Sequence, residues 1–86
     1  MNNLLITYDL HFSGQDYQAL IEKIQSLGQA KSILKSVWVL KTSLSADVVR
    51  KSLQTVMDKN DFIFVCRFDE WSAFMLEESN QFISGA

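Results

Sequence analysis

The strands expected from this sequence carry apolar side chains on both of their faces. In residues 4–10, Leu5 and Ile6 point to opposite faces, and in residues 32–42 the same is true of Trp38 and Val39. Only two helical stripes are available as a cover, which is enough for one face of a sheet. The second face therefore needs another cover, and a two-fold partner is the commonest cover for a small protein.

Two amphipathic helices are predicted, over residues 16–27 and 45–60. In the first, Ser13 stands three residues before Asp16 as a variant capping box, and Gly28 supplies a stop. In the second, Ser45 is the N-cap and Asp47 lies in the favourable first turn. The apolar stripes consist of Tyr17, Leu20, Ile21, Ile24 and Leu27 in the first helix, and of Val49, Leu53, Val56 and Met57 in the second.

Strand patterns occupy much of the remaining chain. Residues 32–42 form either one long bent strand or a hairpin, residues 61–69 alternate strictly, and residues 71–78 are expected to add a short strand. We therefore expect an α+β fold of the ferredoxin-like βαββαβ type, with two helices on one face of an antiparallel sheet and a dimer through the other face. The domain is expected to span residues 4–76, with residues 77–86 as a C-terminal tail.

Composition narrows the class of protein. Eighty-six residues make one small domain, and the net charge of -2 with a pI near 5.1 lacks the basic excess typical of nucleic-acid binders. The eight basic residues can still gather on one side after folding. The lone Cys66 forms no intrachain disulfide and, among phenylalanines, fits a packed thiol. No apolar leader or spanning segment is seen, so we expect a cytoplasmic protein without a membrane partner.

Four segments of the chain together carry a resemblance to a known family. They are LLITYDL, SGQDYQALIEKIQSLG, KSVWVLKT followed by SADVVRKSL, and NDFIFVCRFDEW, and they span roughly residues 4 to 74. In this order and spacing they resemble the small CRISPR-associated Cas-two proteins of antiviral defence, and more closely their stand-alone SinR-like relatives. The resemblance implies a ferredoxin-like homodimer, either a metal-dependent nuclease or a non-catalytic scaffold that holds DNA for an integrase-type partner.

The same resemblance implies a site around Asp9. In the family pattern this position is the aspartate that follows the strand-one tyrosine, here Tyr8, and its two copies share a divalent metal across the dimer. Ser36, within KSVW, matches a polar position often near that site. Mg²⁺ or Mn²⁺ is the expected cofactor, because these ions prefer oxygen ligands and can activate water beside a phosphate of RNA or DNA.

Other roles remain open for these residues. Asp9 can instead accept hydrogen bonds from the amides of the turn HFSG, a common task for aspartate near turns. His11 is a candidate general base or an exposed loop residue. Two hypotheses follow: a metal-dependent endonuclease that uses Asp9 from both chains, or a catalytically inactive scaffold or toxin-antitoxin-like interaction protein.

Overall fold

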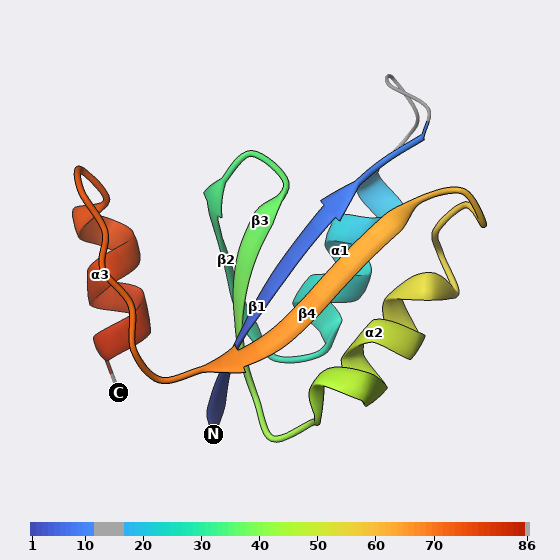
Figure 1. The fold of residues 1–86 in the computed structure, drawn as a ribbon. Helices are drawn as coiled ribbons and strands as arrows, with labels where there is room; N and C mark the ends of the chain where they lie inside the picture. The colour runs from blue at the N-terminus through green and yellow to red at the C-terminus, as the bar shows by residue number, and fades with distance from the viewer. Residues whose placement is uncertain (12–16, 86) are drawn as a thin grey trace.

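The computed structural model describes residues 1–11 and 17–85, which form one four-stranded sheet and three helices (Figure 1). The strands are β1 (Asn2–Asp9), β2 (Gln29–Leu34), β3 (Val37–Thr42) and β4 (Phe62–Phe68), and the helices are α1 (Gln18–Ser26), α2 (Ala46–Gln54) and α3 (Glu77–Ser84). The strand order is β2-β3-β1-β4, and every neighbouring pair is antiparallel. This small α+β arrangement is compatible with a ferredoxin-like fold.

The core lies between the sheet and the helices α1 and α2. Alternate residues of the central strands, Leu4 and Ile6 in β1 and Leu40 in β3, are at most 1% exposed. Each such side chain contributes about 1.5 to 3 kcal/mol through burial. The other members of this core cluster are Leu20, Ile24, Trp38, Val49 and Leu53. The two predicted helical stripes therefore cover one face of the sheet, as the sequence pattern indicated.

The helix boundaries differ from the predicted ones. Ser45 caps α2 as expected, because its side chain accepts a hydrogen bond from the backbone N–H of Val48 at 3.1 Å. The helix ends at Gln54, however, and the expected end near Asn60 is wrong, because residues 55–60 form turns. The predicted capping box of Ser13 and Asp16 lies outside the described residues.

Residues 29–42 form a hairpin, so the second of the two predicted arrangements is the correct one. β2 and β3 are joined by a tight turn at Lys35 and Ser36, and a register irregularity lies between Ser32 and Leu34. Ser36 has a φ of 59°, a left-handed conformation that closes the turn. The hairpin tip consequently lies beside the end of β1, where the Tyr8 N–H donates to the carbonyl oxygen of Ser36 at 3.3 Å.

The C-terminal region departs most from expectation. The strand expected over residues 71–78 is wrong, because residues 70–76 form a connecting segment without strand structure, and α3 follows. Glu77 and Glu78 lie in the first turn of α3, where carboxylates favour the helix dipole. Ser79 and Ile83 lie one turn apart and are the buried residues of this helix. Residues 77–86, expected as a tail, thus contain a packed helix.

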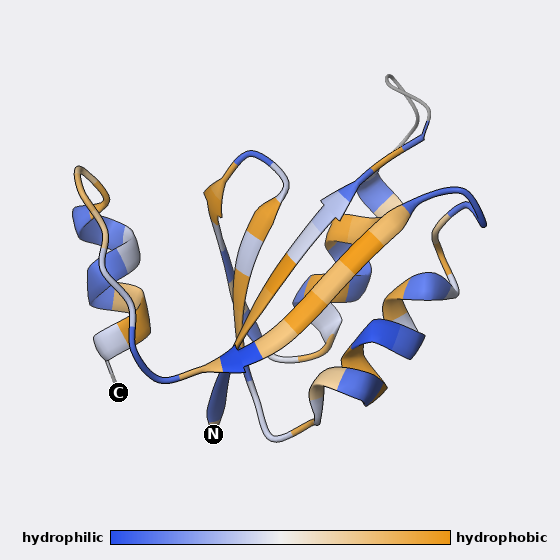
Figure 2. Cartoon of the chain, in the orientation of Figure 1, coloured by the Kyte–Doolittle hydropathy of each residue, from blue (hydrophilic) through white to orange (hydrophobic). Residues whose placement is uncertain are grey.

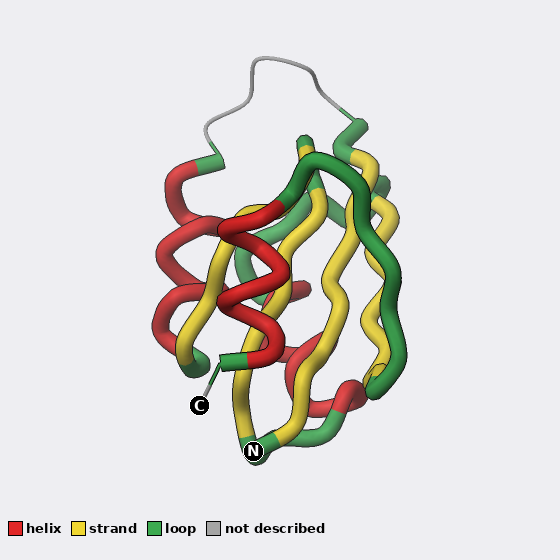
Figure 3. The backbone as a smooth tube through the Cα atoms, turned by 90° about the vertical axis from the view of Figure 1, so that its left-hand side faces the viewer, coloured by secondary structure: helices red, strands yellow, loops and turns green. Residues whose placement is uncertain are grey.

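Helix α3 lies apart from α1 and α2, beside the β2 edge (Figures 1 and 3). Figure 3 shows that the segment after β4 runs along the side of the sheet away from α1 before α3 turns back. Ile83 is 7% exposed, and the Lys41 ammonium lies 4.8 Å from the centroid of the Phe82 ring. Lys31 pairs with Glu78 at 3.6 Å. Helix α3 and the segment before it therefore cover part of the second sheet face, which α1 and α2 leave uncovered.

Candidate functional site

One part of the second sheet face remains uncovered, and we call it the open sheet face. Its residues are neighbours in the strand register, because Thr7 pairs with both Val37 and Phe64, and Asp9 pairs with Phe62. Phe62 and Phe64 are 71% and 60% exposed. Figure 2 shows β4 as hydrophobic along most of its length. The open sheet face consists of Thr7, Asp9, Val37, Phe62 and Phe64, and it combines a carboxylate with exposed aromatic rings.

Asp9 is the last residue of β1, and its side chain is exposed. It borders a shallow hollow of about 210 Å³ on the open sheet face, whose described lining includes Phe62 and Phe64. It also borders a second hollow, of about 420 Å³, that extends toward α1 and the hairpin tip. The lining of this second hollow consists of Tyr8, Asp9, Leu10, Tyr17, Ile21, Lys35 and Ser36. The two hollows thus share two lining residues, Tyr8 and Asp9.

Tyr8 and Ser36 are brought to the same place as Asp9. The Trp38 indole N–H donates to the Tyr8 hydroxyl at 3.2 Å, and this partly buried hydrogen bond holds the Tyr8 side chain beside Trp38 of the core. Ser36 joins the site through the hairpin turn, with its backbone carbonyl bonded to the Tyr8 amide. Three of the four residues selected from the sequence therefore line one hollow, and the closing of the hairpin on β1 is what brings them together.

His11 lies apart from both hollows, in an exposed position after β1. Its backbone N–H donates to Asp61 Oδ1 at 2.7 Å, and Asp61 Oδ2 accepts from the Asp58 N–H at 2.8 Å. No pattern in the sequence predicted that Asp61 binds these two amides. The His11 amide is therefore bound by Asp61, whereas the other turn amides that Asp9 was expected to bind belong to residues outside the described part of the chain.

A divalent metal would depend on two copies of this site. In residues 1–11 and 17–85, no group of three or more histidine, cysteine, aspartate or glutamate side chains is arranged to hold a metal ion. Asp9 is the only carboxylate among the described residues that line the two hollows. Magnesium often binds through one or two carboxylates and keeps several waters. Asp9 supplies one such carboxylate, and a second copy of the chain would supply the other.

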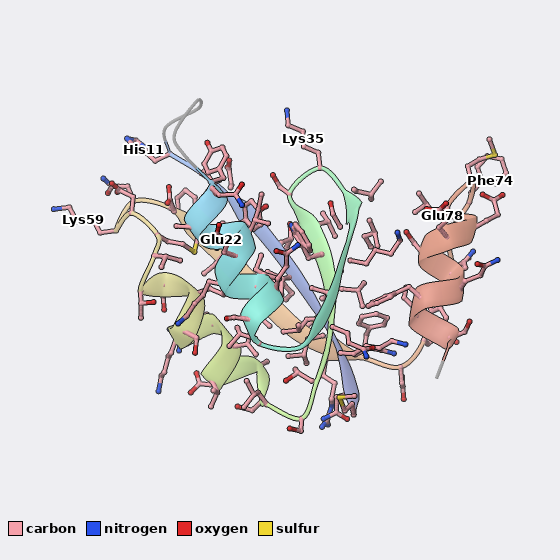
Figure 4. All side chains as sticks on the ribbon, turned by 180° about the vertical axis from the view of Figure 1, so that it is seen from behind. His11, Glu22, Lys35, Lys59, Phe74 and Glu78 are labelled. Atoms are coloured by element: carbon pink, nitrogen blue, oxygen red, sulfur yellow. The ribbon has the colours of Figure 1, made fainter. Side chains whose placement is uncertain are left out.

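Several basic side chains are already engaged elsewhere. Arg50 and Lys51 of α2 lie 2.7 and 3.1 Å from the carboxylate of Asp47. The pKa of that exposed carboxyl group is lowered, mainly by its hydrogen bond to Arg50 and next by the one to Lys51. Lys41 donates to the Gly85 carbonyl. Lys35 instead stands at the hairpin tip, and Figure 4 shows its side chain extending away from the body of the protein at the end where His11 lies. Lys35 is thus the basic residue that lines a hollow with Asp9.

A third, mainly apolar pocket of about 500 Å³ lies between α3, the preceding segment and the sheet. Trp71 lines it, donates from its indole nitrogen to Asn80 Oδ1 at 3.0 Å, and meets the Phe68 ring edge to face. Cys66 pairs with Leu5 in the register and is half-buried. Trp71 therefore anchors α3, and Cys66 lies in the strand next to this packing.

No family model, no curated protein and no solved structure matches this chain. Among the described helices, none has the length and apolar character needed to cross a membrane.

Proposed function

We propose that the chain is a Cas-two-like, nucleic-acid-associated homodimer that hydrolyses phosphodiester bonds of RNA or DNA with a divalent metal held by Asp9 of both protomers. A single observation carries this proposal: Asp9 lies on the same open sheet face as the exposed Phe62 and Phe64. A surface that draws two chains together through these rings also brings the two carboxylates close to each other.

The case for self-association rests on the exposed rings. Transferring a phenylalanine side chain from water into an interface is favourable by about 1.5 to 3 kcal/mol. In a two-fold interface each residue acts twice, so Phe62 and Phe64 supply four rings. Helix α3 covers the neighbouring part of the sheet, where Val39 is 0% exposed. The interface we propose is therefore limited to the half of the sheet near β4 and the end of β1.

The strand order supports the finer fold assignment within this proposal. The order β2-β3-β1-β4, with antiparallel neighbours, is the one in which two βαβ units interlock as a split pair. We take it as the ferredoxin-like topology implied by the family resemblance. Helix α3 is then an addition that follows the βαββαβ unit.

The residues of each chain have separate tasks in this scheme. Asp9 offers carboxylate oxygens, and the two copies repel each other until a cation lies between them. The Tyr8 hydroxyl accepts from Trp38, which holds the end of β1 in place. A divalent ion held by the two Asp9 carboxylates would supply Lewis-acid chemistry, activating water and neutralising charge on the phosphate. His11 lies outside both hollows and takes no part in this scheme.

A catalytically inactive scaffold is the second candidate. The net charge of -2 and the single carboxylate that each chain gives to the site favour this alternative. In that case the open sheet face still forms the dimer, and the assembled surface binds a partner such as an integrase-type protein. Asp9 then has a structural task at the end of β1.

Metal removal separates the two candidates. We expect purified protein to cleave single-stranded RNA or duplex DNA with Mg²⁺ or Mn²⁺, and EDTA to abolish the cleavage, because EDTA removes the metal on which the proposed reaction depends. The products should be followed with labelled substrates on denaturing gels. Absence of cleavage with every metal and both substrates would refute the nuclease and favour the scaffold. Cleavage that persists in EDTA would contradict a metal mechanism.

A further inference from the structure

The hollow of about 420 Å³ between the end of β1, the start of α1 and the hairpin tip has features that the dimer does not use. We call it the Tyr17 pocket. Two aromatic side chains, Tyr8 and Tyr17, line it together with the apolar Leu10 and Ile21. Its size falls in the range of about 300 to 1,000 Å³ that is usual for small-molecule sites. The pocket can therefore hold a flat, partly apolar group of modest size.

The backbone around the pocket is fixed by hydrogen bonds. The Tyr17 carbonyl accepts the first bond of α1, from the Ile21 N–H at 3.0 Å. The Tyr8 hydroxyl accepts from Trp38, and the Tyr8 amide is bonded to the hairpin turn. The Tyr8 ring, held through its hydroxyl, therefore loses little conformational freedom when a ligand binds. This favours a stacking ligand over one that requires a rearranged site.

Charged groups of opposite sign lie on the rim. Asp9 is on the side toward the open sheet face, and Lys35 is on the hairpin tip, with its side chain extending outward (Figure 4). A purely aliphatic ligand would form no ion pair or hydrogen bond with either charged side chain. A simple inorganic anion would make no use of the rings. A nucleotide has a planar base for the rings and a phosphate for the ammonium, so it matches both parts of the lining.

We propose that the Tyr17 pocket binds one nucleotide unit of single-stranded nucleic acid, with the base stacked on Tyr17 and Lys35 paired with its phosphate. The neighbouring phosphate then lies toward Asp9, and this part of the inference rests on the proposed function. A base within a duplex already has its faces stacked, so the pocket selects an unpaired base. A free mononucleotide offers the same chemistry, and the experiment separates the two sources.

The test is fluorescence anisotropy with a labelled single-stranded RNA of about ten nucleotides, in EDTA so that no cleavage occurs; this length fits the span bound per module. Tyr17→Ala should weaken binding about 30-fold, the middle of the range that base stacking contributes, whereas Tyr17→Phe should bind like wild type. Lys35→Gln should also weaken binding, and the slope of log affinity against log salt concentration should become shallower by about one. Lys51→Gln makes the same charge change on α2, away from the pocket, and should have no effect.

Uridine and adenosine monophosphates serve as competitors. Competition by a mononucleotide at the concentration needed for the oligonucleotide would identify the free nucleotide as the ligand, and weaker competition would identify the strand. Amide shifts of Ile21 and Ser36 in NMR titrations with the same probes report the pocket directly, and they also check that Tyr17→Ala is folded. Unchanged RNA affinity in folded Tyr17→Ala and in Lys35→Gln would overturn the proposal.

The two proposals fail in different ways. A wild-type protein that binds RNA through Tyr17 but neither dimerises nor cleaves would refute the proposed function and support the pocket. Cleavage that depends on Asp9, combined with RNA binding that is indifferent to Tyr17 and Lys35, would refute the pocket and support the proposed function.

Discussion

An Asp9→Asn variant is expected to lose its metal-dependent cleavage while it keeps its fold. The substitution preserves the shape of the side chain but removes one negative charge per chain, hence two per dimer. The loss should exceed the roughly 10- to 100-fold decrease that removal of a supporting group near a metal causes, because Asp9 is a proposed ligand itself. Initial cleavage rates at saturating Mn²⁺, compared between the variant and wild type, measure the effect.

Stability gives an independent readout for the same variant. Paired carboxylates repel each other without metal, so Asp9→Asn should leave the urea midpoint of the metal-free protein unchanged or higher. Asp69→Asn is a matched control, because Asp69 follows β4 at the opposite end of the sheet and should affect neither property. Full activity in Asp9→Asn would refute the paired-carboxylate mechanism. Equal losses in both variants would point to a general charge effect.

A Phe64→Ser variant is expected to weaken the dimer strongly. The ring of Phe64 is 60% exposed in one chain and lies at the centre of the proposed interface, where truncation of a central aromatic residue costs about 2 to 4 kcal/mol. Because the residue occurs once in each protomer, we expect the dissociation constant to rise by at least about 100-fold. Dilution calorimetry of the variant and wild type gives both constants.

Phe74→Ser is the matched control for this experiment. Phe74 is even more exposed, at 86%, but it lies in the segment before α3 and not on the open sheet face. Its removal should leave the dissociation constant within a few-fold of wild type. The reverse result, in which Phe74→Ser dissociates the dimer and Phe64→Ser does not, would move the interface to the α3 side of the molecule.

Local patterns were sufficient to predict the core of this fold. The apolar spacing of α1 and α2 and the Ser45 cap act within a few residues, and the alternation of β4 correctly separated Ile63 and Val65 from the phenylalanines, although it did not predict which set faces the helices. The region after β4 was misread because Trp71, Phe74 and Met75 favour strands by propensity. Residues 70–76 form a connecting segment instead, and burial of Ser79 and Ile83, one turn apart, favours a helix over residues 77–84.

Tyr8, Asp9 and Ser36 were selected from the sequence, and the structure brings them to one hollow. Asp9 was selected from its place at the end of the first strand and from the family motif. Tyr17 and Lys35 were missed as site residues because each has an ordinary role in its own segment, a helix stripe and a turn. They share a pocket only after the hairpin closes on β1, a tertiary contact that no spacing in the sequence records. Asp61 was missed for the same reason, since its partner His11 is fifty positions away.

Sedimentation equilibrium of the wild-type protein tests whether the chain forms a homodimer. Both the proposed metal site and the proposed nuclease activity require two chains. At micromolar concentration we expect a single species with a mass near twice the 9.9 kDa of one chain. The dimer should persist in EDTA, since the aromatic rings of the open sheet face and not the metal supply most of the association. A mass of 9.9 kDa across the whole concentration range, with and without Mg²⁺, would contradict the proposed homodimer and its shared metal site.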